Sequence, residues 1–98
     1  MIIVTGSVRG RPEKLGELLA ISLEHVHRSR DEPGCILHSV HRNVEDPSTV
    51  VFLEHWEDRA SLTAHFAVPA SRQFVGAAAA LAATPPTISI YEATPIEL

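Results

Sequence analysis

The sequence predicts one α+β domain in which the elements follow the order β-α-β-β-α-β. Its length of 98 residues suits a single hydrophobic core. Hydrophobic residues make up 45% of the chain and charged residues 20%, which is typical of a globular protein. Four runs rich in β-branched residues alternate with stretches of helical periodicity and with turns that contain glycine or proline. We therefore assign residues 1–98 to a single domain.

The first third of the chain predicts a strand followed by a helix. Ile2–Arg9 is a β-branched run that ends at a Gly-Arg-Pro loop, and Pro12 suits the first turn of the following helix. Five apolar residues share helical spacing and should face the core: Leu15, Leu18, Leu19, Leu23 and Val26. The helix should end near Arg30, before a turn that contains Pro33 and Gly34.

The middle of the chain predicts an antiparallel hairpin. Cys35–Asn43 and Thr49–Trp56 form its strands, and the connection Val44–Ser48 carries turn residues. The second strand is apolar on both of its faces, with Val50, Phe52 and Trp56 on one face and Val51 and Leu53 on the other. Because a strand that is apolar on both faces is usually covered on both, we expect cover on each side of the sheet.

The last third predicts a second helical layer and a final strand. Asp58 suits the N-cap of a helix, and Pro69 begins a further helical stretch that becomes rich in alanine and ends before Pro85 and Pro86. Thr87–Ala93 alternates apolar and polar residues and predicts the last strand. The complete order is the split βαβ arrangement of a ferredoxin-like fold with an antiparallel sheet.

This arrangement leaves one face of the sheet without helices. Because the strand Thr49–Trp56 is apolar on that face as well, we expect a homodimer in which two sheets pack against each other. The space between the two sheets would then be the ligand cavity.

Charge and cysteine content argue against several classes of partner. The chain has 8 Lys and Arg against 12 Asp and Glu, a formal charge of −4, and its basic residues are scattered. This pattern argues against nucleic acid and anionic membranes as partners. The sequence also lacks a Gly-rich phosphate loop. One cysteine, no signal-peptide pattern and no apolar stretch long enough to span a bilayer predict a cytoplasmic protein without a membrane segment.

Histidine is unusually frequent, with 6 residues in the chain. Their spacing matches no metal-binding motif, so we expect no metal. His25 and His27 lie two positions apart on the first predicted helix and should be solvated.

Four further residues have both a functional and a structural interpretation. If His38 and Glu54 line the cavity, they are polar groups in an apolar chamber, where pKa values shift and proton transfer becomes useful. Otherwise, Glu54 pairs with a basic residue. Trp56 either lines the same chamber or fills the core. His65 either transfers a proton or hydrogen-bonds a backbone carbonyl. Cys35 should be a buried small hydrophobe.

Four segments of the chain resemble the antibiotic biosynthesis monooxygenase family, and in particular its quinol monooxygenase-like members. These segments are Glu32–Cys35, Leu53–Asp58, Leu62–Phe66 and Pro69, in this order. The resemblance implies a ferredoxin-like fold that forms a dimeric α/β barrel. It also implies oxygenation of electron-rich aromatic substrates such as quinols and anthrones without metal, flavin or haem.

The resemblance extends to single residues, with departures. It implies that Trp56 belongs to the pocket and that His65 is the histidine of the quinol-type members. Phe52 occupies a position where some polyketide-type members carry asparagine, and Ala70 occupies one where a histidine is frequent. Val75 lies where the haem-degrading branch has its haem-ligating histidine, which argues against haem degradation.

Our leading hypothesis is a cofactor-independent monooxygenase that oxidises a small aromatic substrate with O₂ in a homodimer. We assign His65 and His38 to proton transfer or anion stabilisation. We assign substrate binding to Trp56, Phe52 and Glu54. One alternative is a non-catalytic, ligand-binding or stress-related dimeric barrel. Another is a cofactor-free isomerase of phosphorylated sugars, for which Arg42 or Arg72 would point into the cavity.

Overall fold

Four strands form one antiparallel sheet in the computed structural model, which describes residues 1–98. The strands are β1 (Ile2–Arg9), β2 (Cys35–Arg42), β3 (Thr49–Trp56) and β4 (Thr87–Glu92), in the spatial order β2-β3-β1-β4. The helices are the short 3₁₀ helix η1 (Pro12–Lys14), α1 (Leu15–Ser29), α2 (Arg59–Ala67) and α3 (Pro69–Leu81). The predicted ferredoxin-like order is confirmed, with the second helical layer divided into α2 and α3.

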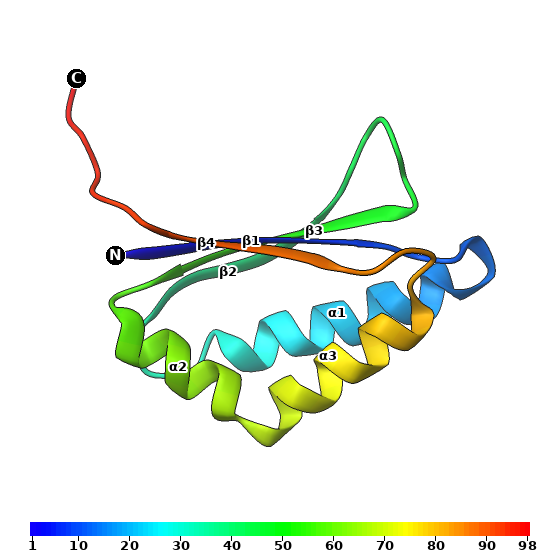
Figure 1. Cartoon of the computed structure of the whole chain (residues 1–98), viewed down its shortest axis with the longest axis horizontal. Coiled ribbons are helices and arrows are strands. Elements are labelled where there is room, and N and C mark those ends of the chain that lie inside the picture. The colour runs from blue at the N-terminus through cyan, green and yellow to red at the C-terminus, as the bar shows by residue number, and fades with distance from the viewer.

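The α-helices all lie on the same face of the sheet (Figure 1). α1 and α3 run side by side beneath it, and α2 lies near one end. The opposite face carries no helix, as the sequence predicts. Among the helices, none combines the length and the apolar character that a bilayer crossing requires.

The boundary between α2 and α3 follows from proline chemistry. Val68 has an extended backbone (φ −64°, ψ 124°), and Pro69 begins the next helix. A residue before proline avoids the helical conformation because the proline ring crowds its backbone. At the other end of α2, the side chain of Asp58 accepts a hydrogen bond from the backbone N–H of Ser61 at 2.8 Å, so the predicted N-cap is confirmed.

The core is divided into two apolar clusters between the sheet and the helices. The larger cluster contains Val8, Leu18, Val26, Val50, Phe52, Ala78 and Leu81, and the smaller one contains Ile2, Val4, Trp56 and Leu62. On β3, Phe52 belongs to the first cluster and Trp56 to the second, and Glu54 lies between them on the same face. A buried polar position therefore separates the two apolar clusters.

The burial of alternate residues along β3 shows which of its faces packs against the helices. Phe52, Glu54 and Trp56 are buried under the helices, whereas Val51 and Leu53 are half-buried on the open face. His38 is paired opposite Glu54 and is buried with it. His38, Glu54 and Trp56 therefore lie on the helix-covered face, and the condition that would place them in a cavity between two sheets is not met.

The buried stripe of α1 also differs from the expectation. Leu23 was expected in the core, but 48% of its surface is exposed. The buried positions of α1 are Leu18, Ser22, His25, Val26 and Ser29. Three of these five residues are polar, so α1 presents hydrogen-bonding groups to the interior of the protein.

Candidate active site

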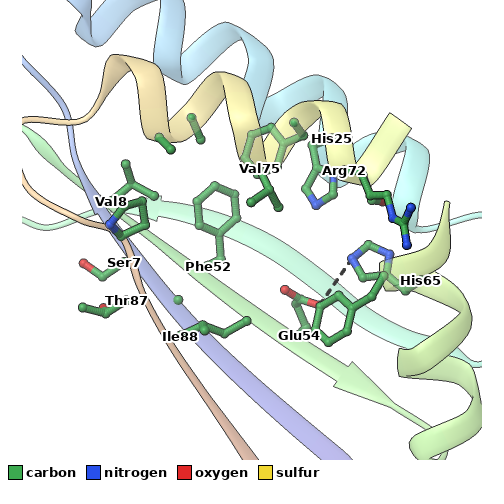
Figure 2. Close-up of a pocket in the computed structure, with 17 residues that line it drawn as sticks. Ser7, Val8, His25, Phe52, Glu54, His65, Arg72, Val75, Thr87 and Ile88 are labelled. Carbon is green, nitrogen blue, oxygen red and sulfur yellow. Dashed lines mark ion pairs between the residues drawn. The ribbon is translucent and has the colours of Figure 1, made fainter. Parts of the chain in front are cut away.

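A cavity of about 620 Å³ lies between the sheet and α3 (Figure 2). Its walls are mainly apolar side chains from β1, β3, β4 and α3: Val8, Phe52, Phe74, Val75, Ala78 and Ile88. The volume is within the range of small-molecule binding sites. The cavity lies inside one chain, whereas the sequence predicted a cavity between two sheets.

Three buried ionisable residues from three elements line the same cavity. They are His25 from α1, Glu54 from β3 and His65 from α2. Their exposed fractions are only 4%, 7% and 3%, so all three are almost fully removed from bulk water. Burial lowers the pKa of His25 and raises that of Glu54. Buried ionisable groups that line a cavity are typical of functional sites.

The predicted site residues divide into two groups. Phe52, Glu54 and His65 line this cavity between the sheet and α3. His38 and Trp56 do not line it. They lie beside Glu54 on the same face of the sheet, on the neighbouring strand β2 and two positions further along β3, with exposed fractions of 2% and 0%. Any contribution of His38 or Trp56 to catalysis therefore acts through Glu54 or His65.

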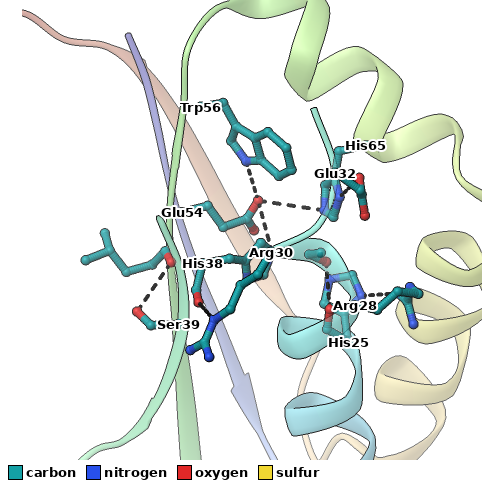
Figure 3. Close-up of polar contacts among 11 residues, drawn as sticks. His25, Arg28, Arg30, Glu32, His38, Ser39, Glu54, Trp56 and His65 are labelled. Atoms are coloured by element: carbon teal, nitrogen blue, oxygen red, sulfur yellow. Dashed lines mark hydrogen bonds and ion pairs between the residues drawn. The ribbon is translucent and has the colours of Figure 1, made fainter. Parts of the chain in front are cut away.

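Trp56 holds the carboxyl group of Glu54 in place. The indole Nε1–H of Trp56 donates a hydrogen bond to Oε1 of Glu54 at 2.9 Å (Figure 3). The same oxygen lies 3.4 Å from Nε2 of His38, without hydrogen-bond geometry, and 3.8 Å from Nε2 of His65. Burial raises the pKa of Glu54, and the hydrogen bond from Trp56 partly opposes this effect. The carboxyl group is thus fixed in position and favours its protonated form more than an exposed glutamate does.

His65 is paired with a carboxylate that the site analysis of the sequence did not include. Nδ1 of His65 lies 2.8 Å from Oε1 of Glu32, in the turn before β2. Because a carboxylate only accepts, Nδ1 donates this hydrogen bond and the lone pair of the neutral ring lies on Nε2. His65 does not use its ring to bond a backbone carbonyl, which was the alternative interpretation.

Glycine brings Glu32 to this position. Gly34 has a φ of 80°, and a Cβ atom there would clash with the side chain of Ser61 at the start of α2. The turn therefore packs directly against α2, the helix that carries His65. Glu32 could have been considered from the sequence, because it belongs to the Glu32–Cys35 segment that resembles the family.

His25 is buried, so the expectation that it is solvated is wrong, whereas His27 is exposed. Nδ1 of His25 accepts a hydrogen bond from the Arg28 guanidinium at 2.6 Å, and its ring stacks on Phe74 at a centroid distance of 4.1 Å. Burial lowers the pKa of His25 to about 3, and the neighbouring His38, His65 and Arg28 lower it further. Helical spacing could have identified this residue, because His25 lies seven positions after the buried Leu18.

Three imidazole rings meet at the polar end of the cavity. One ring nitrogen from each of His25, His38 and His65 lies within 4.8 Å of the others, a spacing that can hold a metal ion. The spacing of the histidines along the sequence did not predict this cluster. The hydrogen bond from Arg28 opposes metal binding, because it leaves the proton of His25 on Nε2 rather than a lone pair. The absence of a resident metal stays a prediction.

Comparison with known proteins identifies relatives along most of the chain. The family model "Antibiotic biosynthesis monooxygenase" matches residues 1–77. The Synechocystis protein sll1783 is 36% identical over 91 residues, which cover 93% of this chain and only 62% of that protein's length. The Bacillus subtilis protein named "Putative monooxygenase YcnE" is 34% identical over 71 residues, covering 67% of this chain and 75% of that protein.

A solved structure agrees with these matches in fold. The crystal structure of an antibiotic biosynthesis monooxygenase superposes on this chain with a TM-score of 0.89 and 29% sequence identity. The match covers 97% of this chain and 100% of the other. The sheet with helices on one face, the matching segments and the superposition lead to one conclusion: the chain belongs to the antibiotic biosynthesis monooxygenase family.

Proposed function

We propose that this protein is a cofactor-independent monooxygenase that oxidises a small hydroxylated aromatic substrate, such as a quinol or an anthrone. The observation that carries the proposal is His65, which lines a mainly apolar cavity and is paired with Glu32. The apolar walls suit an aromatic ring, and the pair suits removal of a proton from it. Family membership supports the same class of reaction.

Proton removal is the step for which the site is arranged. Nε2 of His65 carries a lone pair and belongs to a ring that lines the cavity, so it accepts a proton from the bound substrate. Glu32, 2.8 Å from Nδ1, keeps the ring in this tautomer and stabilises the imidazolium that forms. Oε1 of Glu54 lies 3.8 Å from Nε2 of His65, so Glu54 provides a second polar contact for the substrate.

The deprotonated substrate then reduces O₂ itself. One oxygen atom forms a bond to a ring carbon, and the other leaves as water together with two hydrogens from the substrate. The substrate supplies all four electrons, so a quinol yields a hydroxyquinone and an anthrone yields an anthraquinone without a further reductant. The protein binds the ring, takes the proton and stabilises the anion.

A homodimer is part of the proposal. Val51 and Leu53 on the open face are apolar and only half-buried, although no helix covers them. A second copy of the sheet would bury these side chains. The buried ionisable groups that line the cavity come from one chain, so the dimer is expected to stabilise the protein rather than to complete the site. A cytoplasmic location, which rests on the single cysteine, stays a prediction.

Oxygen consumption tests the proposed function. Metal-free protein is mixed with a panel of naphthohydroquinones and anthrones, and the aerobic and anaerobic reactions are compared. We expect His65→Ala to reduce kcat by about 10²- to 10⁴-fold, the usual contribution of a general base. His27→Ala is the matched control, because this histidine is exposed and lies outside the cavity. Oxygen consumption no faster than the uncatalysed rate, or unchanged in His65→Ala, contradicts the proposal.

One observation favours an alternative, the cofactor-free isomerase of a phosphorylated substrate. Arg72 lines the cavity near His65 (Figure 2), and a phosphate would contact it there. Arg42, the other arginine considered, instead donates to the carbonyl of Pro47 and does not line the cavity. A substrate panel that includes sugar phosphates separates the two functions, because only the monooxygenase consumes O₂.

A further inference from the structure

We infer that His25, together with Arg28, forms an oxyanion-binding subsite in which the imidazole Nε2–H donates a hydrogen bond to the ionised oxygen of a bound hydroxyarene. The inference rests on the proposed function for the class of substrate. It assigns a role to a helix residue that differs from the role of His65.

Arg28 determines the tautomer of His25. The guanidinium of Arg28 lies 2.6 Å from Nδ1 and has only donors, so Nδ1 accepts and Nε2 carries the proton. Glu32 has the opposite effect on His65, because it accepts from Nδ1 and leaves the lone pair on Nε2. The cavity is therefore lined by one imidazole that offers a lone pair and one that offers an N–H.

The Nε2–H donor of His25 is accessible from the cavity. Nε2 of His25 makes no hydrogen bond within the protein, and it is not among the fully buried unpaired atoms, whereas both ring nitrogens of His38 are. The ring reaches from α1 toward the cavity (Figure 2) and stacks on Phe74 with an interplanar angle of 6°. The stacked contact holds the ring plane, so the N–H keeps its direction when a ligand enters.

The charges at the subsite favour an anionic ligand. Burial keeps the His25 ring neutral at physiological pH, with its pKa lowered to about 3, so it donates a hydrogen bond without competing for the substrate proton. Arg28 lies behind the ring and supplies a positive charge that favours an anion. In an apolar cavity, a hydrogen bond to an anion is stronger than the same bond in water.

The distance between the rings fits one shared oxygen. A ring nitrogen of His25 lies within 4.8 Å of a ring nitrogen of His65. Because Nδ1 of each ring is already bonded, to Arg28 and to Glu32, Nε2 is the nitrogen that each ring offers to a ligand. One oxygen atom between them can contact both at ordinary hydrogen-bond lengths of about 2.7–3.2 Å. The oxygen whose proton moves to His65 is thus the oxygen that His25 stabilises, and this chemistry selects a substrate with an acidic hydroxyl group.

The ionisation of a bound probe tests the subsite without turnover. We choose 4-nitrophenol because its absorbance reports ionisation and its nitro group makes it a poor reductant of O₂. In the wild-type protein, we expect bound 4-nitrophenol to ionise at lower pH than free 4-nitrophenol. In His25→Phe, which keeps the stack on Phe74, the midpoint should rise by about one pH unit, a roughly tenfold weaker preference for the anion. His27→Phe should match the wild type.

A second variant tests the tautomer while His25 is retained. Arg28→Glu replaces a donor by an acceptor, so Nδ1 takes the proton and a lone pair on Nε2 faces the anion. We expect the probe midpoint to rise, whereas Arg30→Glu, with the same change in charge but no contact to the His25 ring, should change it less. Nitrogen-15 NMR of the histidine rings should place the wild-type proton of His25 on Nε2.

The results distinguish this inference from the proposed function. An unchanged midpoint in His25→Phe, or a proton on Nδ1 of His25 in the wild-type spectrum, overturns the subsite even if the protein consumes O₂. Nitrophenolate binding that depends on His25, in a protein without oxygenase activity, supports the subsite and rejects the proposed function.

Discussion

Oε1 of Glu32 lies 2.8 Å from Nδ1 of His65, although the two residues are separated by 33 positions in the chain. The turn that carries Glu32 packs on the start of α2 because Gly34 permits a close approach to Ser61. This contact converts a histidine that could point its lone pair either way into one with a defined base on Nε2.

Glu32→Gln should reduce kcat while the fold is kept. The amide has no negative charge to stabilise the imidazolium, and its NH₂ group can donate to Nδ1 and reverse the tautomer, so we expect a loss of at least about tenfold. Steady-state oxygen consumption measures the change. Glu24→Gln, on the exposed surface of α1, is the control and should behave as the wild type. Equal activity of the two variants contradicts the assigned role of Glu32.

Trp56→Phe should destabilise the protein through Glu54. The variant removes the indole donor at 2.9 Å and leaves a buried carboxyl group without this partner, which costs about 1–3 kcal/mol in addition to the lost packing. Urea unfolding measures the difference in the free energy of unfolding. Trp56→Phe should cost less when Glu54→Leu is already present, because that carboxyl group is then absent. Additive effects of the two substitutions would show that the hydrogen bond contributes little.

Stability should fall on acidification below the ordinary range of histidine. Burial lowers the pKa of both His25 and His38 from 6.5 in the unfolded chain to about 3 in the folded one. Their stabilising contribution is complete above pH 6.5 and is lost between pH 6.5 and about 3, where only the unfolded chain binds their protons. The folding equilibrium constant should change by up to about tenfold per pH unit for each histidine.

Glu54 contributes in the opposite direction, because its raised pKa gives a contribution that is present at low pH and lost as the pH rises. Chemical unfolding at several pH values measures the net slope. The slope should be shallower in His25→Phe and unchanged in His27→Phe, where the exposed ring is removed. An identical slope in His25→Phe and the wild type contradicts the neutral state of His25.

Leu53→Lys should weaken the proposed dimer. The side chain lies half-buried on the open face of β3, and a lysine there would place a charge between the two sheets. Light scattering coupled to gel filtration should give twice the 10.7 kDa of one chain for the wild type and a smaller mass for the variant. Val44→Lys, in the exposed connection between β2 and β3, should stay a dimer. A wild-type protein that is monomeric at micromolar concentration contradicts the proposed sheet packing.

The sequence predicted much of the fold because local patterns determine it. β-branched runs and proline positions identified the four strands and the break at Pro69, and one domain of this length has helices for only one face of the sheet. Alternation along β3 also placed Phe52, Glu54 and Trp56 on one face. Alternation, however, does not say which of the two faces packs against the helices. Because the face with Phe52 and Glu54 does so, the cavity lies within one chain and not between two sheets.

The site depended on packing that no local pattern contains. His25 is buried because it lies on the same side of α1 as Leu18, which faces the interior, whereas Leu23 lies on the exposed side. The sequence by itself therefore determined the order of elements, the family and three residues of the cavity wall. Only the tertiary structure decided that Glu32 and Arg28 give His65 and His25 opposite tautomers, because a proton on an imidazole is placed by whichever donor or acceptor the fold brings to its other nitrogen.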